Sequence, residues 1–310
     1  MNTTLSAARR SKKPAREPRA QPSLRPYVWM LGSGVAFTVM GAFAHGLRDQ
    51  CDWQVIAIAR SSVAMILAAI LVVMSGKRFV ILKPGILWMR SFAGSVSLIC
   101  TFYAFTRLPM ADVFTLTNMV PIWVALISWP LLGKAPSLGV WLCILLGVAG
   151  VALIQQPQHL VEGNFAVPLA CLSSLTSAIA MLGLNRLRHI DPRAIVVHFS
   201  AVATVVSFGA LFVGEHSHPF AEILQGPTLL QLFSTGVAAT VGQLLLTKAY
   251  AEGVPSKVAV VGLCQIVFSL GLDVLIFDHA VNGLTLLGMA LVVGPTAWVM
   301  LRSATPGDNV

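Results

Sequence analysis

An asparagine and a proline lie three residues apart in the segment NMVPIW, inside the apolar run 113–132. Asn118 and Pro121 are costly in a helix surrounded by lipid, because an amide there needs a hydrogen-bond partner and a proline removes a backbone donor. The proline also frees a carbonyl one turn earlier, so the helix is predicted to kink or loosen beside Asn118.

Gln265 occupies nearly the same depth in a later apolar run. Two amides that approach each other in this way would form a neutral polar floor for a bound molecule, because polar groups buried in apolar helices are often functional. The alternative is that both amides hydrogen-bond to neighbouring helices and that Pro121 is a tolerated kink.

Titratable side chains inside the apolar runs are further candidates. A charge such as Arg60 costs at least about 2.5 kcal/mol near the bilayer centre unless it reaches a partner, water or headgroups. Asp273 is its candidate partner, in an ion pair that acts either as a gate or as a structural tie. His198 is a candidate proton carrier for a coupled cycle, or a neutral ring bonded to a backbone carbonyl. Arg90 is expected to extend to the nearer membrane surface.

The sequence offers little for metal or catalytic chemistry. The five cysteines are odd in number, scattered and mostly inside apolar runs, which predicts neither a disulfide framework nor a metal site. The motif EHSH at 215–218 is the one candidate pair of histidines, in a short polar segment where such residues are usually solvated. We therefore expect no metal and no cofactor.

The composition is that of a membrane protein. Of the 310 residues 56% are hydrophobic and 11% charged, and the mean hydropathy is +0.79, far from the balance of a soluble domain. About 20 mainly apolar residues cross a bilayer as a helix, and the runs lack the alternation of a membrane barrel. Ten such runs occur, at 27–47, 54–74, 85–108, 111–132, 137–154, 165–187, 193–213, 228–251, 255–277 and 281–302.

The net charge of +9 is distributed in a way that favours a membrane over nucleic acid. Basic residues fill the tail 1–26, which is expected to be disordered, and they recur beside every second connection between the runs. The opposite connections are mainly acidic. The positive-inside rule then places both termini in the cytoplasm of a multi-pass inner-membrane protein. The first run is too long for a secretory signal and no small-residue cleavage site follows it.

The two halves of the chain resemble each other. Aligning Thr101 with Thr247 also places Pro109 on Pro255 and sets 118–119 on 264–265. Because each half holds an odd number of runs, the second half must enter the membrane from the opposite side. The sequence therefore predicts an all-α integral membrane protein with ten transmembrane helices in an inverted five-plus-five repeat. The repeats are expected at 27–155 and 156–302, followed by a short tail at 303–310.

A long segment carries a family resemblance. From Arg90 it reads RSFAGSVSLICTFYAFTRLPMADVFTLTNMVPIWVALISWPLLGKAPSLGVWLC, and together with ten runs and the repeat it resembles the EamA-domain transporters of the drug/metabolite transporter superfamily. Lys134 departs from the acidic residue usual in that family. The resemblance implies a cavity between the two repeats and alternating access. The RSFAG and FYAF elements are also similar to uptake proteins for S-adenosylmethionine and riboflavin.

The predicted function is a secondary transporter without an ATPase, since GxxxxGK[ST] does not occur. No carboxylate lies near the middle of a run, which favours a neutral, zwitterionic or anionic metabolite, such as an amino acid or a cofactor-like molecule. We expect partners to be this metabolite and the lipid bilayer, with no nucleic acid, and a monomer or homodimer. Two alternatives stay open: a membrane-embedded enzyme acting on lipids or acyl groups, and a membrane sensor that transports nothing.

Overall fold

The structure is a computed structural model that describes residues 23–47, 50–108, 110–133, 135–156, 165–212, 225–277 and 282–304. Within these ranges it is all-α and contains no strand. Ten stretches of helix in the described part are long and apolar enough to cross a membrane, which confirms the predicted fold class and the count. Most of both predicted tails, Lys134 and the EHSH segment at 215–218 lie outside the described residues.

The helices follow one another with short connections. Two of the ten spans are divided into a pair of shorter helices, α4 with α5 and α11 with α12. The bounds are α1 Arg25–Gly46, α2 Trp53–Met74, α3 Gly85–Arg107, α4 Met110–Thr117, α5 Val120–Leu132, α6 Leu138–Gln155, α7 Ala166–Arg186, α8 Pro192–Ala210, α10 Gly226–Glu252, α11 Pro255–Gly262, α12 Cys264–Phe277 and α13 Gly283–Ala304.

Several helices begin at a proline, which has no backbone N–H to leave unbonded in the first turn. Proline occupies one of the first two positions of α1, α5, α8, α10 and α11. At the start of α8 the Asp191 carboxylate also accepts a hydrogen bond of 2.9 Å from the backbone N–H of Arg193, which satisfies a donor that the helix cannot.

The distribution of side chains is inverted relative to that of a soluble protein. Large apolar side chains cover the outside of the bundle, among them Val73, Leu145, Phe208 and Leu230. Small hydroxyl side chains are buried between the helices, including Ser33, Ser91 and Thr247. Helices that associate in lipid pack through small and hydroxyl residues because burying apolar surface gains little there. The exterior is thus suited to lipid.

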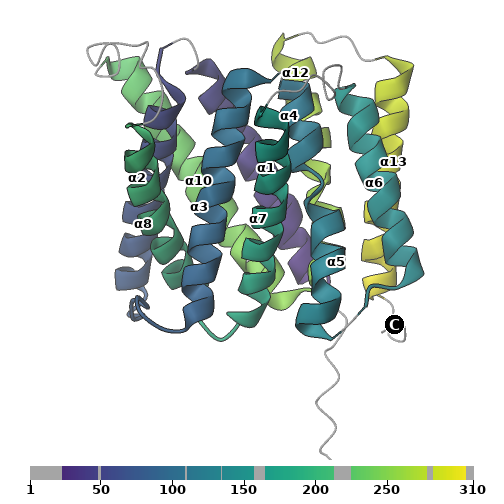
Figure 1. Cartoon of the computed structure of the whole chain (residues 1–310), viewed down its shortest axis with the longest axis horizontal. Coiled ribbons are helices and arrows are strands. Elements are labelled where there is room, and N and C mark those ends of the chain that lie inside the picture. Colours follow the sequence, from purple (N-terminus) through teal and green to yellow (C-terminus); the bar gives the residue numbers. More distant parts are fainter. Residues whose placement is uncertain are drawn as a thin grey trace, which may run out of the picture.

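The helices stand side by side in a broad bundle (Figure 1). α2 and α8 lie together at one end of the row, and α6 and α13 at the other. In the middle, α1 packs along α10 and α3 packs along α7. α1 begins and α13 ends at the same face of the bundle, where the hydroxyl groups of Tyr27 and Ser303 are 3.0 Å apart. We call this face the terminal face.

The helix pairs follow a symmetric scheme. Counted as spans, the first packs on the eighth and the third on the sixth, while the second packs on the seventh and the fifth on the tenth. Exchanging each span with the one five positions later leaves this set of pairs unchanged. Such a scheme is what the predicted inverted repeat requires, although the inversion itself stays a prediction.

Candidate functional site

A central cavity of about 320 Å³ lies among the helices in the middle of the row. Every described helix except α6 and α13 contributes to its wall. The polar and charged lining residues are Arg60, Arg90, Ser97, Thr101, Thr117, Asn118, Ser177, Gln243, Tyr250 and Gln265. The rest of the wall is mainly apolar, and no described residue that lines the cavity is a carboxylate.

Both divided spans break at this cavity. α4 ends at Thr117 and α5 begins at Val120, with Pro121 in the first turn of α5, where it cannot donate to the carbonyl four residues earlier. The break therefore lies at Asn118, beside which the sequence predicts a kink. The second break, at Leu263 between α11 and α12, is not predicted by any proline. Its sequence signal is Gly262 together with the alignment of the two halves.

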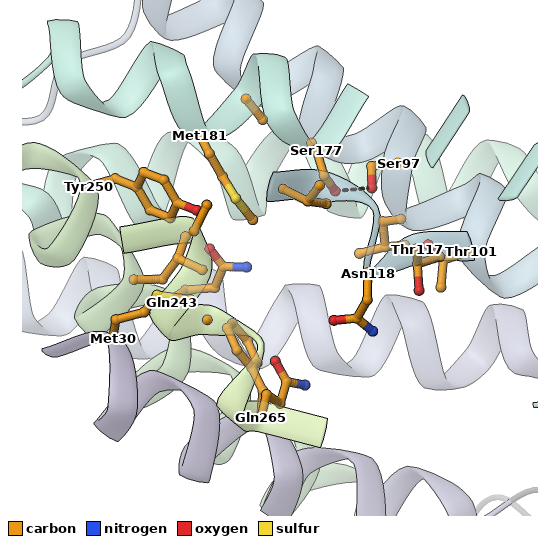
Figure 2. A pocket seen from close by; sticks show the side chains of 18 of the residues that line it. Met30, Ser97, Thr101, Thr117, Asn118, Ser177, Met181, Gln243, Tyr250 and Gln265 are labelled. Atoms are coloured by element: carbon orange, nitrogen blue, oxygen red, sulfur yellow. Dashed lines mark hydrogen bonds between the residues drawn. The ribbon is translucent and has the colours of Figure 1, made fainter. Parts of the chain in front are cut away.

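Asn118 projects into the cavity from the first break (Figure 2). Its side-chain nitrogen donates a hydrogen bond of 2.8 Å to the carbonyl of Phe114 in the last turn of α4. This bond orients the side chain at the end of α4, where the same carbonyl also accepts a hydrogen bond of 3.0 Å from the backbone N–H of Asn118. The amide oxygen accepts no hydrogen bond from the described residues, so it remains able to accept one from a bound molecule.

Gln265 enters the cavity from the other break. Its side-chain amide makes no hydrogen bond within the described part of the chain, whereas its backbone carbonyl accepts one of 3.4 Å from the hydroxyl of Thr38. Figure 2 shows the amides of Asn118, Gln243 and Gln265 around one space, with Met181 and Tyr250 on one side and Thr101 and Thr117 on the other. The structure thus brings the two amides singled out in the sequence to one cavity.

Arg90 does not extend to the membrane surface, so that expectation is wrong. Its side chain is only 3% exposed, and its Nη2 donates a hydrogen bond of 3.2 Å to Oε1 of Gln243. The guanidinium lies 4.2 Å from the ring centroid of Phe199. A cation–π contact and an amide acceptor hold the group at the cavity wall.

Arg60 also lines the cavity, from α2. It is half-buried and forms neither an ion pair nor a hydrogen bond with the described residues. Asp273 is a residue of α12, but its side chain is outside the part of the chain that the structure describes. The ion pair between Arg60 and Asp273 therefore stays a prediction.

A cluster of hydroxyl groups joins α3 to α7 beside the cavity. The Ser97 hydroxyl lies 2.6 Å from that of Ser177 and 3.0 Å from that of Ser173, and the Thr101 hydroxyl lies 2.6 Å from Ser173. These bonds satisfy polar groups that lipid would leave unbonded. These hydroxyl residues are not among the site residues predicted from the sequence, although in each helix they show the spacing of four residues that places side chains on one face.

His198 is not among the described residues that line the cavity. Its Nδ1 lies 2.7 Å from the Ser91 hydroxyl and its Nε2 lies 3.1 Å from the carbonyl oxygen of Ile81. A carbonyl can only accept, so Nε2 carries a proton; in the neutral ring Nδ1 then accepts from the serine hydroxyl. The edge of the ring also contacts Trp88, with centroids 4.6 Å apart. His198, on α8, thus links that helix by a hydrogen bond to the connection before α3.

The described residues contain no group of three or more His, Cys, Asp or Glu side chains that could hold a metal ion. Each of the five cysteines is a thiol outside any disulfide. The chemistry available in the cavity is therefore hydrogen bonding by amides and hydroxyls together with two positive charges.

Comparison with known proteins agrees with this arrangement. The sequence profile described as "EamA-like transporter family" matches residues 24–156 and again residues 164–301. The chain is 27% identical over 277 residues to the "Pseudopaline exporter CntI" of Pseudomonas aeruginosa, covering 85% of this chain and 94% of that protein. It is 25% identical over 240 residues to "Solute carrier family 35 member G1" of Mus musculus, covering 72% of this chain and 63% of that protein.

A solved crystal structure superposes on this one with a TM-score of 0.77 at 15% sequence identity, covering 90% of this chain and 98% of that chain. At this identity the likeness concerns the fold alone.

Proposed function

This chain belongs to the EamA-like transporter family, and from that premise we propose that it moves a small neutral, zwitterionic or anionic metabolite across the membrane by alternating access. That it is a membrane transporter and not an enzyme follows from the family and from the transporters to which it is similar. The substrate, the site residues and the mechanism of access are our proposals.

The observation that carries the proposal is the cavity at the two helix breaks. Asn118 and Gln265 present amide groups to the same space from two different spans. Broken helices at the middle of a membrane bundle are a common way of building a substrate site, because unwound backbone and freed side chains can bind a polar molecule. The hydroxyls of Thr101, Thr117 and Tyr250 add further hydrogen-bonding groups.

Alternating access is supported by the way in which the helices pair. Each half contributes spans that pack mainly on spans of the other half, as expected of two inverted repeats, here assigned to 27–155 and 156–302, that rock against each other around a fixed site. α6 and α13 pack on each other and contribute nothing to the described cavity wall. We assign them a supporting role at the edge of the moving parts.

We also propose an inner-membrane location with the terminal face toward the cytoplasm, because of the basic residues beside that face. Lys77, Arg78, Arg188 and Arg193 all lie in or beside connections on this side. Insertion of a cysteine tag next to Ser303, followed by labelling with a membrane-impermeant reagent in intact cells and in open vesicles, measures the orientation. Labelling in intact cells would show that the terminal face lies outside the cytoplasm, and the proposed orientation would be wrong.

The test of the substrate site is binding to the purified full-length chain in detergent. Amino acids, S-adenosylmethionine, riboflavin and organic anions are compared by the rise in melting temperature, since a ligand that binds only the folded state stabilises it by mass action. Asn118→Ala and Gln265→Ala are expected to lose the response. Gln225→Ala is the matched control, because Gln225 is an exposed amide outside the cavity lining.

Transport itself is then measured in proteoliposomes with the labelled compound. Uptake that depends on the protein, and that falls in both cavity variants but not in Gln225→Ala, is the expected result. A compound that stabilises Asn118→Ala, Gln265→Ala and the parent protein equally would remove these amides from the substrate site.

A further inference from the structure

We propose that the transported metabolite is an organic anion whose carboxylate or phosphate group binds to Arg90 and Arg60 in the central cavity. This inference rests on the proposed function and narrows it to one class of substrate. It starts from the charge of the cavity: two guanidinium groups line it, and none of its described lining residues is a carboxylate.

Arg90 is buried with most of its hydrogen-bonding capacity unused. Its one hydrogen bond within the described residues goes to Gln243, and its Nε is buried without any partner there. A guanidinium has five N–H donors and carries a full charge. A buried charge is tolerated when a counter-charge pairs with it and its donors are hydrogen-bonded. The neutral amide of Gln243 accepts from one donor of Arg90 and supplies no counter-charge.

The wall beside Arg90 is shaped around its guanidinium. A Cβ on Gly94 would lie 2.5 Å from Nη1 of Arg90 and 2.8 Å from the ring of Phe199. Gly94 therefore leaves the space that the guanidinium occupies, and the ring of Phe199 holds the planar group at the cavity surface. Such a fixed, planar donor matches the planar geometry of a carboxylate, or two oxygens of a phosphate, with little loss of side-chain freedom on binding.

Arg60 supplies the second charge from a different helix. It lines the same cavity and forms no hydrogen bond or ion pair with the described residues. Two positive groups in one cavity repel each other, and an anion between or beside them relieves that repulsion. A cationic substrate would meet both charges without a described counter-charge in the wall, so the same arrangement selects against it.

The remainder of the cavity suits the rest of an organic anion. Its volume of about 320 Å³ is at the small end of the range for ligand pockets, about 300–1,000 Å³. Apolar side chains such as Phe37 and Phe114 line it beside the amides of Asn118 and Gln265. A compact carbon skeleton with one or more acidic groups fits this combination better than a bare inorganic ion.

The experiment compares each organic anion with a neutral counterpart on the purified full-length protein. The probes are succinate, glutarate and citrate with their amides, and glycerol 3-phosphate with glycerol, together with inorganic phosphate. Affinities come from the concentration dependence of the melting temperature. At least one carboxylate or phosphate ester is expected to stabilise the protein when its neutral counterpart does not. Comparison of the carboxylates with the phosphate ester shows which acidic group the cavity binds.

Arg90→Gln is expected to weaken that binding at least about 30-fold, the lower end of the cost of truncating one partner of a buried charged hydrogen bond. Arg60→Gln is the second variant; since Arg60 makes no hydrogen bond with the described residues, its loss should leave folding intact. Arg188→Gln makes the same change of charge at an exposed position and is expected to leave the affinity unaltered.

Three results would overturn the inference. If a neutral amide stabilises the protein as well as its acid does, and Arg90→Gln and Arg60→Gln respond like the parent, the cavity is a substrate site but not an anion site. If inorganic phosphate alone stabilises the protein, an anion binds but no organic anion does, and the inference is again wrong. If no probe of either kind stabilises the protein, the anion inference is overturned, while the broader panel with Asn118→Ala still decides the proposed function independently.

Discussion

Gly94→Ala is the smallest change that should displace the Arg90 guanidinium without removing it. The added Cβ would lie 2.5 Å from Nη1, and ordinary contact begins at 3.4 Å, so the guanidinium must move by about 0.9 Å. A charged hydrogen bond to an anion has a length of about 2.7–2.9 Å, and a displacement of this size breaks it. The bond from Nη2 to Gln243, already 3.2 Å long, should break as well.

The effect on stability has three contributions. Losing a hydrogen bond that involves a charged group costs about 1.5–3 kcal/mol, and displacing the Phe199 ring, 2.8 Å from the same Cβ, costs about 1–3 kcal/mol. Alanine is more favourable than glycine inside a helix by about 0.8–1.0 kcal/mol, so the free energy of unfolding should fall by about 1.5–5 kcal/mol. Losing one charged hydrogen bond lowers the affinity for the anion about 10- to 150-fold.

Titration of the anion against the melting temperature measures both quantities, since the ligand-free value reports stability and the concentration dependence reports affinity. Gly41→Ala is the matched control, because a Cβ on Gly41 meets nothing within 4 Å. If Gly94→Ala binds the anion as tightly as the parent does, the position of the Arg90 guanidinium does not determine binding and the reasoning about its fixed geometry is wrong.

Three further changes test other parts of the structure. In Gly288→Ala the new Cβ would lie 2.6 Å from the backbone oxygen of Gly150, so α6 and α13 must separate. The free energy of unfolding should fall by about 1–3 kcal/mol, while the ligand affinity stays within about twofold of the parent value. A large loss of affinity would show that these helices shape the cavity. Tyr250→Phe removes a hydroxyl from the lining. We expect the ligand affinity to fall about 2- to 10-fold, the contribution of one neutral hydrogen bond, while the melting temperature without ligand is unaltered. Equal affinities would exclude a hydrogen bond between the Tyr250 hydroxyl and the ligand. His198→Gln should leave the pH profile of transport unchanged while hydrogen exchange increases near Ile81, whereas a flattened profile would establish His198 as a proton carrier.

The fold was largely predictable because the bilayer restricts it so strongly. Backbone groups in lipid must bond within a helix or a closed barrel, so ten apolar runs without alternation translate directly into ten membrane helices. The helix break at Asn118 has a local cause in Pro121, which is visible in the sequence. The break at Leu263 has no such residue, and only the alignment of the two halves connects it with the first.

The charged part of the cavity was not predictable from position alone. Arg90 lies close to the start of α3, where a long side chain usually reaches the membrane surface. Its actual direction depends on Gln243 and Phe199 from distant parts of the chain and on the space left by Gly94. Gln243 was missed for a related reason: a polar residue in a buried helix can serve helix packing equally well, and only the three-dimensional arrangement separates the two roles.

The symmetric frame and the asymmetric lining have different physical origins. Helix pairing depends on small residues and ridges spread along whole spans, so two repeated halves keep it even after their sequences have diverged. Recognition depends on a few atoms, and a small metabolite with an acidic group at one end has no two-fold symmetry. Both guanidinium groups come from the first half, on α2 and α3, while the second half supplies the amides of Gln243 and Gln265. When the segment that begins at Ala59 is aligned with the one that begins at Val197, His198, which is outside the described lining, matches Arg60 of the first half. A site of this kind binds a polar molecule in one orientation, with its anionic group toward α2 and α3.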